Sequence, residues 1–291
     1  MKQLLVLSGK GGTGKTTIAT ALIQLTQARA YADCDVDAPN LHLLMHQPSE
    51  PDQKDFYGLD KAVIHPEQCT ACNLCRQHCR FEAIDVDAET GCCQVNSFAC
   101  EGCGVCSFVC PAEAVSMEPA KAGELMLYKG DSVFSTAMLK MGSGNSGMLV
   151  TEVKKRMKKA AAPTERLAVI DGSPGIGCPV IASMTGVDMI LIVAEPSISG
   201  ISDMKRVVET AQGLQAKMAV CINQWDNSPA HTNAIEAYCR EMNLPVMGRI
   251  PYDPEVVKAV NQGKSIAEVS CKAGEAVNHI HQQLITILFN Q

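Results

Sequence analysis

A glycine- and lysine-rich loop near the N-terminus constrains the fold of this 291-residue chain more than any other feature. The loop runs from Ser8 to Thr17 and reads SGKGGTGKTT. It follows a short apolar run, Lys2–Leu7, that is typical of a buried strand, and it leads into Lys15–Ala28, where apolar residues recur at helical spacing. A strand, a glycine-rich turn and a helix in this order form a phosphate-binding loop, because successive backbone N–H groups and the helix N-terminus point at one anion.

The residue types in the loop indicate what it binds. Lys15 is placed to reach the β- and γ-phosphates of a nucleotide, and Thr16 is placed to offer its hydroxyl to Mg²⁺. An aspartate that follows a later strand, Asp35 or Asp171, would lie near that ion. We therefore expect ATP and Mg²⁺ as cofactors. The nucleotide-binding residues expected in the loop are Gly9, Lys10, Gly11, Gly12, Thr13, Gly14, Lys15, Thr16 and Thr17.

Apolar runs and amphipathic stretches alternate along most of the chain. The runs typical of parallel strands covered on both faces are Ala30–Cys34, Leu167–Ile170, Met189–Val193, Met218–Ile222 and Val246–Ile250. Further strands of this sheet or its edge are expected at Glu124–Lys129 and Ser132–Met138. Helical stretches are expected at Met148–Ala160, Ser202–Leu214, Pro229–Met242 and Ala273–Leu288. This alternation predicts an α/β fold with a mainly parallel sheet and right-handed crossovers.

The alternation stops in the segment 59–119. Apolar residues become sparse there, and the stretch from Asp60 to Glu118 contains nine acidic residues but only three basic ones. A hydrophobic core cannot be assembled from such a stretch, so something else must hold it together. We therefore predict two domains: residues 1–58 and 120–291 form the nucleotide-binding domain, and 59–119 form an inserted small α+β domain.

Two runs of four cysteines lie in the insert. Both runs have the spacing C-x2-C-x2-C-x3-C, which is the pattern of bacterial ferredoxins. The first run is Cys69, Cys72, Cys75 and Cys79, and the second is Cys100, Cys103, Cys106 and Cys110. In two-cluster ferredoxins the fourth cysteine of each run ligates the other cluster. This predicts one [4Fe–4S] cluster on Cys69, Cys72, Cys75 and Cys110, and a second on Cys79, Cys100, Cys103 and Cys106. Metal–sulfur bonds would supply the stability that the thin core lacks.

Zinc ribbons are the alternative for these cysteines, but they use two well-separated C-x2-C pairs rather than unbroken runs of four. Cys92 and Cys93 lie between the runs, in an expected hairpin turn, and are interpreted as non-ligands. Arg80 follows the first run where proline follows the second, and its charge near a cluster would raise that cluster's reduction potential.

Composition excludes several classes of function. The chain is 46% hydrophobic and 19% charged with a net charge of −6, so a nucleic-acid-binding surface is not expected. The longest apolar runs are far shorter than a membrane span, and no membrane anchor or signal peptide is expected. Fifteen cysteines without an export signal favour metal or redox chemistry in a reducing compartment, which indicates the cytoplasm.

The segment Lys10–Thr16 resembles the deviant Walker A motif, K-G-G-x-G-K-[ST], of the MinD/ParA group of P-loop ATPases, and matches it at every position. The resemblance implies an ATP-dependent homodimer in which Lys10 reaches the partner's nucleotide. Asp35 resembles the switch I residue that orients or activates the attacking water, and Asp171 resembles the Walker B aspartate that leads into switch II. The expected catalytic residues are thus Lys10, Lys15, Asp35 and Asp171.

The same resemblance indicates where the base binds. Asn223 is similar to the family's adenine-reading asparagine, and the loop that contains Pro251 and Asp253 is similar to the one that closes over the base. Asn223–Asp226 also approximates the N-K-x-D motif that reads guanine, with Gln224 in place of lysine. GTP is therefore an alternative to ATP, which the match of the phosphate loop favours.

Most of the chain resembles MinD-superfamily ATPases that carry an inserted ferredoxin domain. The resemblance implies a nucleotide cycle coupled to electron transfer, in a homodimer or a heterodimer with a paralogue, with a redox or metal-cluster protein as partner. An iron–sulfur or metal-cluster carrier like the Mrp/Nbp group is the alternative. Cys178, in a stretch comparable to one that ligates a cluster in the nitrogenase iron protein, is its possible extra ligand. A positioning ATPase is less favoured, because His279–Gln291 has neither lysine nor arginine.

Coupling between the two predicted domains would start at switch I. The insert begins shortly after Asp35 and returns before Leu167, so a shift of switch I on nucleotide binding would be carried into it. The alternative is that a polar linker, His46–Asp55, which contains Pro48 and Pro51, decouples the two parts.

Overall fold

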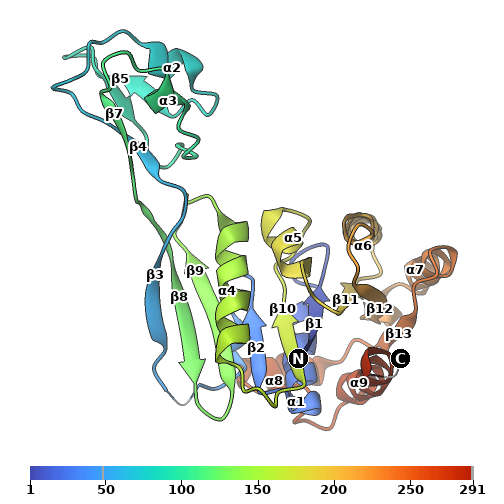
Figure 1. Cartoon of the computed structure of the whole chain (residues 1–291). Coiled ribbons are helices and arrows are strands. Elements are labelled where there is room, and N and C mark those ends of the chain that lie inside the picture. Colours follow the sequence, from blue (N-terminus) through green and yellow to red (C-terminus); the bar gives the residue numbers. More distant parts are fainter. Residues whose placement is uncertain (48, 290–291) are drawn as a thin grey trace. The chain divides into compact units, whose positions relative to one another are not determined.

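The main sheet of the protein has nine strands (Figure 1). The computed structural model describes residues 1–47 and 49–289. The strand order of the sheet is β13-β12-β11-β1-β10-β2-β9-β8-β3, and neighbours from β13 to β9 run parallel. The strands are β1 (Lys2–Leu7), β2 (Ala30–Asp33), β3 (Asp52–Tyr57), β8 (Lys121–Lys129), β9 (Val133–Leu139), β10 (Leu167–Asp171), β11 (Met189–Ala194), β12 (Lys217–Asn223) and β13 (Val246–Ile250). The prediction of a mainly parallel α/β fold is confirmed.

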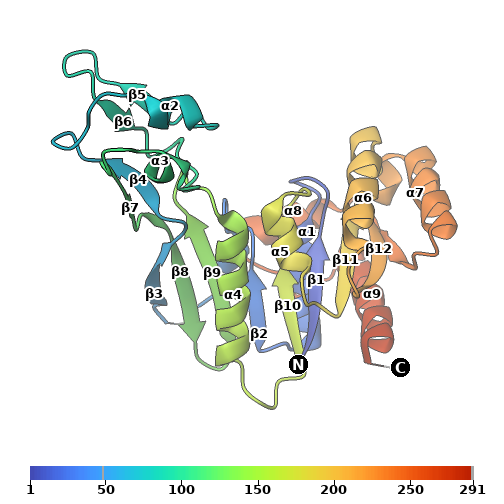
Figure 2. The ribbon, with the colours of Figure 1, turned by 45° about the horizontal axis from the view of Figure 1, so that its top comes forward.

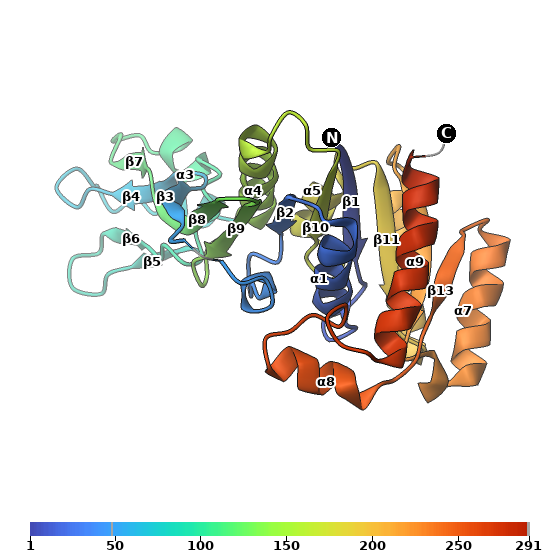
Figure 3. The ribbon, with the colours of Figure 1, turned by 90° about the horizontal axis from the view of Figure 1, so that it is seen from below.

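Helices cover both faces of the parallel part of the sheet. One face is covered by α1 and α9, and the other by α4, α5 and α6 (Figures 2 and 3). The helices of this unit are α1 (Lys15–Thr26), α4 (Ser146–Ala160), α5 (Cys178–Met184), α6 (Ile198–Ala211), α7 (Pro229–Glu241), α8 (Pro254–Asn261) and α9 (Lys272–Phe289). The central strands read as continuous apolar runs because both of their faces are buried in this way.

The chain divides into two compact units. The first comprises residues 1–53, 125–138 and 147–291, and the second comprises 54–124 and 139–146. The boundaries between them fall inside β3, β8 and β9 and at the first residue of α4. The segment interpreted as a polar linker, His46–Asp55, is therefore partly strand, because β3 begins at Asp52. Pro48 of that segment lies outside the described residues.

The second unit is small and contains both helix and strand. Its elements are β4 (Lys61–Ile64), α2 (Leu74–His78), β5 (Ile84–Val86), β6 (Cys93–Val95), α3 (Val105–Phe108) and β7 (Val115–Glu118). The strands form two antiparallel pairs, β4 with β7 and β5 with β6. Four of the eight residues in its buried apolar cluster are cysteines, Cys75, Cys93, Cys100 and Cys106. The prediction that no hydrophobic core can be assembled from this segment is therefore corrected: a small core forms, and half of its buried residues are cysteines.

The second unit consists of two similar halves. Their sequences align at an offset of 31 residues, so that Cys69 in the first half corresponds to Cys100 in the second. Backbone features recur at this offset: φ is positive at Asn73 and Gly104, and the amides of Ala83 and Ala114 donate to the sulfurs of Cys79 and Cys110 at 3.4 and 3.3 Å. The two cysteine runs therefore adopt matching local structures.

Candidate nucleotide site and cysteine cavities

The carboxyl ends of three neighbouring strands bring together three of the four predicted catalytic residues, Lys15, Asp35 and Asp171. Asp171 ends β10 and pairs in register with Asp33, which ends β2, while β1 on the other side of β10 leads directly into the glycine-rich loop. Ligands of open parallel sheets bind at this edge, outside the carboxyl ends of the strands. Asp171 and Asp33 are both fully buried there, so each carboxylate needs partners within the protein.

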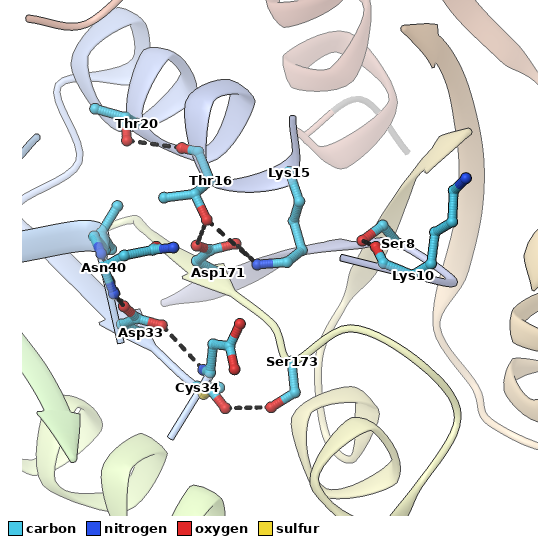
Figure 4. Close-up of polar contacts among 12 residues, drawn as sticks. Ser8, Lys10, Lys15, Thr16, Thr20, Asp33, Cys34, Asn40, Asp171 and Ser173 are labelled. Atoms are coloured by element: carbon cyan, nitrogen blue, oxygen red, sulfur yellow. Dashed lines mark hydrogen bonds and ion pairs between the residues drawn. The ribbon is translucent and has the colours of Figure 1, made fainter. Parts of the chain in front are cut away.

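Asp171 is the centre of a buried polar group formed with the loop (Figure 4). Lys15 Nζ lies 2.7 Å from Asp171 Oδ1, and the Thr16 hydroxyl donates to Asp171 Oδ2 at 2.6 Å. Burial alone would lower the pKa of Lys15, but the ion pair and hydrogen bond with Asp171 outweigh it, and the net pKa of Lys15 is raised. Lys15 is therefore a fixed cation at the start of α1, and Thr16 Oγ1 and Asp171 are two adjacent oxygen donors.

Asp33 organises the loop that follows β2. Its carboxylate accepts hydrogen bonds from the backbone amides of Asp35 at 3.0 Å and of Asn40 and Leu41 at 2.9 Å. Burial, followed by the neighbouring charge of Asp171, raises the pKa of Asp33 to about 7. Asp35 is half-buried, and burial raises its pKa, whereas Asp37 is exposed. Asp33 thus holds the backbone on both sides of Asp35, a role that its sequence position alone did not indicate.

A cavity of about 240 Å³ adjoins the loop on the side of α8. It brings together residues predicted separately as phosphate-binding and base-reading, among them Gly12, Gly14, Thr17, Asn223, Pro251 and Asp253. The Asn223 side-chain amide donates to the carbonyl of Thr13 at 2.7 Å. A Cβ on Gly14 would lie 2.5 Å from that amide nitrogen, and φ at Gly14 is +87°, so only glycine fits.

Two carboxylates near this cavity have structural partners. Asp253 caps α8 by accepting from the amide of Glu255 at 3.0 Å, and it also accepts from the amide of Ala273 at 3.3 Å. Asp226, the last residue of the guanine-like motif, accepts from the amide of Tyr252 at 2.7 Å and is not among the residues that line the cavity. Both carboxylates therefore shape the loop that contains Pro251.

Lys10 points away from Lys15 and Asp171 (Figure 4). Its Nζ lies 2.9 Å from Glu195 Oε2 and 3.3 Å from Ser199 Oγ, at the end of β11 and the start of α6. Both partners of this ion pair are partly exposed, so its contribution to stability is small. The contact with Glu195 could not be predicted from sequence pattern, because the two residues are 185 positions apart in the chain.

A buried lysine joins α4 to the helix that follows Asp171. Lys154 Nζ donates to the carbonyls of Ala182, Ser183 and Thr185 at 3.1, 2.6 and 2.7 Å, around the C-terminal end of α5. Burial lowers the pKa of Lys154. This contact anchors the far end of α5, whose other end begins at the exposed Cys178.

The eight cysteines of the two runs line two separate cavities in the second unit. Cys69, Cys72, Cys75 and Cys110 line the first cavity, and Cys79, Cys100, Cys103 and Cys106 line the second. In each cavity the fourth cysteine of one run lies with three cysteines of the other run. Within residues 1–47 and 49–289, no three His, Cys, Asp or Glu side chains converge so that they could hold one metal ion.

The first cavity contains a fifth cysteine, Cys93, which is 2% exposed. Burial, and then the hydrogen bond with the Cys93 thiol, raise the pKa of Cys75 to about 12. The pKa of Cys69 is lowered, mainly by a hydrogen bond from the backbone amide of Cys93. Cys92 lies at the end of the β5–β6 turn, beside Cys69. The remaining cysteines outside this unit, Cys34, Cys221, Cys239 and Cys271, are buried.

Comparison with known proteins agrees with this architecture. The family model described as the CobQ/CobB/MinD/ParA nucleotide binding domain matches residues 4–266. An uncharacterized protein of Methanocaldococcus jannaschii is 30% identical over 97% of this chain and 96% of its own length. A cytosolic Fe-S cluster assembly factor, the Nubp1 homolog of Drosophila pseudoobscura pseudoobscura, is 24% identical over 98% of this chain and 81% of its own.

Solved structures share the fold. The septum site-determining protein MinD from Pyrococcus horikoshii, complexed with Mg-ADP, is 17% identical with a TM-score of 0.58, and the match covers 98% of this chain and 96% of that one. Among the helices of the described residues, none combines the length and the apolar character needed to cross a bilayer.

Proposed function

The chain belongs to the CobQ/CobB/MinD/ParA family of nucleotide-binding domains, and on this premise we propose that it is an ATP-hydrolysing protein whose nucleotide cycle is coupled to electron transfer through two [4Fe–4S] clusters. The observation that carries the ATPase part is the buried group of Lys15, Thr16 and Asp171 beside the cavity at Asn223. The observation that carries the redox part is the division of eight cysteines between two cavities in the interleaved pattern.

The residues of the nucleotide site have distinct roles in phosphoryl transfer. Lys15 and the loop amides would neutralise charge on the β- and γ-phosphates, which is the main requirement of this reaction. Thr16 and Asp171 would hold Mg²⁺, which supplies further charge neutralisation when bound. Asp35 would orient the attacking water, with the surrounding backbone fixed by Asp33.

ATP is the proposed nucleotide rather than GTP. A guanine-reading aspartate must direct its carboxylate at the base, whereas the Asp226 carboxylate accepts from the Tyr252 amide and lies outside the cavity lining. Gln224 also stands where the guanine motif has lysine. Asn223 lines the cavity and holds the loop carbonyl of Thr13, which is consistent with a base bound against it.

We expect Lys10→Ala to separate nucleotide binding from hydrolysis. Lys10 contacts Glu195 within one subunit and lies outside the Lys15–Asp171 group, so its removal should change ATP affinity little. If Lys10 acts on the nucleotide of a partner subunit, the variant should lose about 10²–10³-fold in hydrolysis, the effect of removing one transition-state donor. ATP-dependent dimerisation should be lost as well.

Dimerisation is measured by light scattering with ATP, and affinity by titration with a fluorescent ATP analogue. Lys2→Ala is the matched control, because Lys2 also pairs with a single partly exposed carboxylate, that of Asp188. A Lys10→Ala protein that hydrolyses ATP as a monomer at the normal rate would refute the role across the dimer.

The cysteine cavities fit [4Fe–4S] clusters by the chemistry and grouping of their donors. A cluster is held by four thiolates, and each cavity offers four among largely apolar neighbours. Zinc ribbons use two well-separated C-x2-C pairs. Each cavity here instead takes three cysteines from one unbroken run and the fourth from the other run. When bound, the clusters would supply one-electron redox chemistry.

Coupling between nucleotide and clusters is expected to appear in affinities. Asp33 ties the residues around Asp35 to Leu41, and the chain then crosses from the first unit to the second within β3. If the two sites are coupled, reduction of the clusters should change affinity for a non-hydrolysable ATP analogue by about 5–150-fold, the usual range of coupling. Titration of oxidised and reduced protein measures the change, and Lys15→Met serves as the control without a competent nucleotide site. Equal affinities in both redox states would mean that the redox state of the second unit does not affect the nucleotide site.

Iron–sulfur cluster assembly is the second candidate function. It is favoured by the relative described as a cytosolic Fe-S cluster assembly factor and by the exposed Cys178 at the start of α5. A carrier would pass its cluster to an acceptor apoprotein and lose iron in doing so. An electron-transfer protein would keep its clusters through many ATP turnovers, and iron counting before and after turnover distinguishes the two.

A further inference from the structure

One lysine of the second unit is buried, although lysine side chains usually stay in water unless they are paired. Lys61, the first residue of β4, is 9% exposed. Its Nζ donates to the backbone carbonyl of Cys100, and Cys100 lines the second cavity. The carbonyl oxygen and the sulfur of one cysteine are at most about 5 Å apart, given standard bond lengths. The ammonium group therefore lies close to the place where the second cluster would bind.

No carboxylate pairs with this ammonium group. The ion pairs of the second unit, within the described residues, join other side chains. Glu118 stands opposite Lys61 in the β4–β7 pair, but its exposed carboxylate accepts from the Ser116 hydroxyl at 2.9 Å. Glu101 lines the second cavity and is exposed as well. Water screens exposed charges more than buried ones, so the charge of Lys61 acts on the cavity more strongly than theirs.

The first cavity has no lysine at the matching position. At the 31-residue offset of the two halves, Lys61 corresponds to Cys92. The residues that follow them, Ala62 and Cys93, line the second and the first cavity respectively. Lys61 is thus related to the second cavity as Cys92 is to the first. The two cavities differ by one buried positive charge at equivalent places.

We propose that the buried ammonium group of Lys61 raises the reduction potential of the [4Fe–4S] cluster in the second cavity. This rests on the proposed presence of the two clusters. Reduction adds one electron and makes the cluster more negative, so a nearby positive charge stabilises the reduced state more than the oxidised one. Net charge is among the factors that set cluster potentials. This role accounts for a buried charge that an apolar side chain at the start of β4 would avoid.

Three substitutions separate the charge of Lys61 from its hydrogen bond. Lys61→Gln keeps a donor for the carbonyl of Cys100 and removes the charge, Lys61→Met removes both, and Lys61→Arg keeps both. Arg80→Gln is the matched control for burial. Arg80 follows Cys79, which also lines the second cavity, but its side chain is exposed.

The experiment is an EPR-monitored titration of anaerobically purified full-length protein, with dithionite as the electron donor. The signal that is missing from Cys103→Ala identifies the second cluster. Lys61→Gln and Lys61→Met should each make reduction of this cluster about tenfold less favourable, which corresponds to 59 mV for one electron. This is the effect of one charge about 12 Å away at an effective dielectric constant of about 20. Lys61→Arg and Arg80→Gln should stay within about twofold of the natural protein.

An unchanged potential in Lys61→Gln would overturn the proposal, because a shift in Lys61→Met alone would then come from the hydrogen bond. A shift as large in Lys61→Arg or in Arg80→Gln would overturn it too, since neither a buried charge nor its removal would then be the cause. If Lys61→Met does not retain its iron, Lys61→Gln decides, because it keeps the donor to Cys100. A natural protein that contains no iron–sulfur signal at all refutes the proposed function instead, before any variant is compared.

Discussion

Lys15→Met is expected to reduce ATP hydrolysis by about 10²–10³-fold and to weaken nucleotide binding severely. Lys15 is the only lysine that lies against Asp171 in the part of the chain that the structure describes, and its position at the start of α1 directs it to the phosphates. The substitution also leaves the fully buried carboxylate of Asp171 without its counter-ion. Breaking a buried pair in this way costs about 3–5 kcal/mol of the free energy of unfolding.

Stability and activity can be separated by a second substitution. In Lys15→Met/Asp171→Asn the unpaired charge at Asp171 is removed as well, so urea unfolding should recover much of the lost stability. Hydrolysis should stay as low as in Lys15→Met, because the phosphates still lack their cation. A single Lys15→Met protein that binds and hydrolyses ATP normally would show that the cavity at Asn223 is not an ATP site.

Cys103→Ala is expected to lower the iron content from about eight to about four atoms per chain. Cys103 lines the second cavity and is exposed, so its loss removes one ligand without leaving a void in the core. On reduction, the interacting EPR signals of two neighbouring clusters should give way to the signal of one. The first unit should stay folded and keep its affinity for ATP, because it shares none of these ligands.

Cys178→Ala is the matched control, since Cys178 is also exposed but lies in α5. It should keep about eight iron atoms. Replacement of Cys110 should remove the other cluster, although Cys110 belongs to the same run as Cys103, because it lines the first cavity. Stoichiometric zinc without iron after strictly anaerobic purification would refute the cluster assignment.

The sequence was most informative where burial is complete. Strands β10 and β11 could be predicted nearly to the residue, because apolar side chains are needed on both faces of a covered parallel strand. Strand β3 was missed because only Phe56 of its six residues is buried. An edge strand needs no apolar face, and charged residues there also prevent pairing with other chains.

Short helices can be predicted from the residues at their first positions rather than from apolar periodicity. Helix α8 could have been found from Asp253 followed by Pro254, a cap and a proline at the first helical position. The sequence prediction instead placed Asp253 only in the loop near the base. Helix α5 begins with Cys178 and Pro179 in the same way but has only seven residues, too few to show a helical period.

Contacts between distant residues could not be derived from pattern at all. Lys154 lies in a lysine-rich stretch that reads as a solvated helix face, yet it is buried against three carbonyls of α5. Likewise, nothing near Lys10 indicated Glu195. Such pairs depend on which helix packs beside which, and a single sequence does not contain that information.

The strand order sets the order in which the two units can form during synthesis. Strand β1 emerges first, but its neighbours in the sheet, β10 and β11, begin only at Leu167 and Met189. By then Cys110, the last cysteine of the two runs, has long left the ribosome. At about 5–20 residues per second, the complete set of thiols waits several seconds for the sheet to close. A newly made chain therefore exposes the eight thiols of the two cysteine runs before its central sheet can form, which leaves an interval in which they can be oxidised unless they are occupied or shielded.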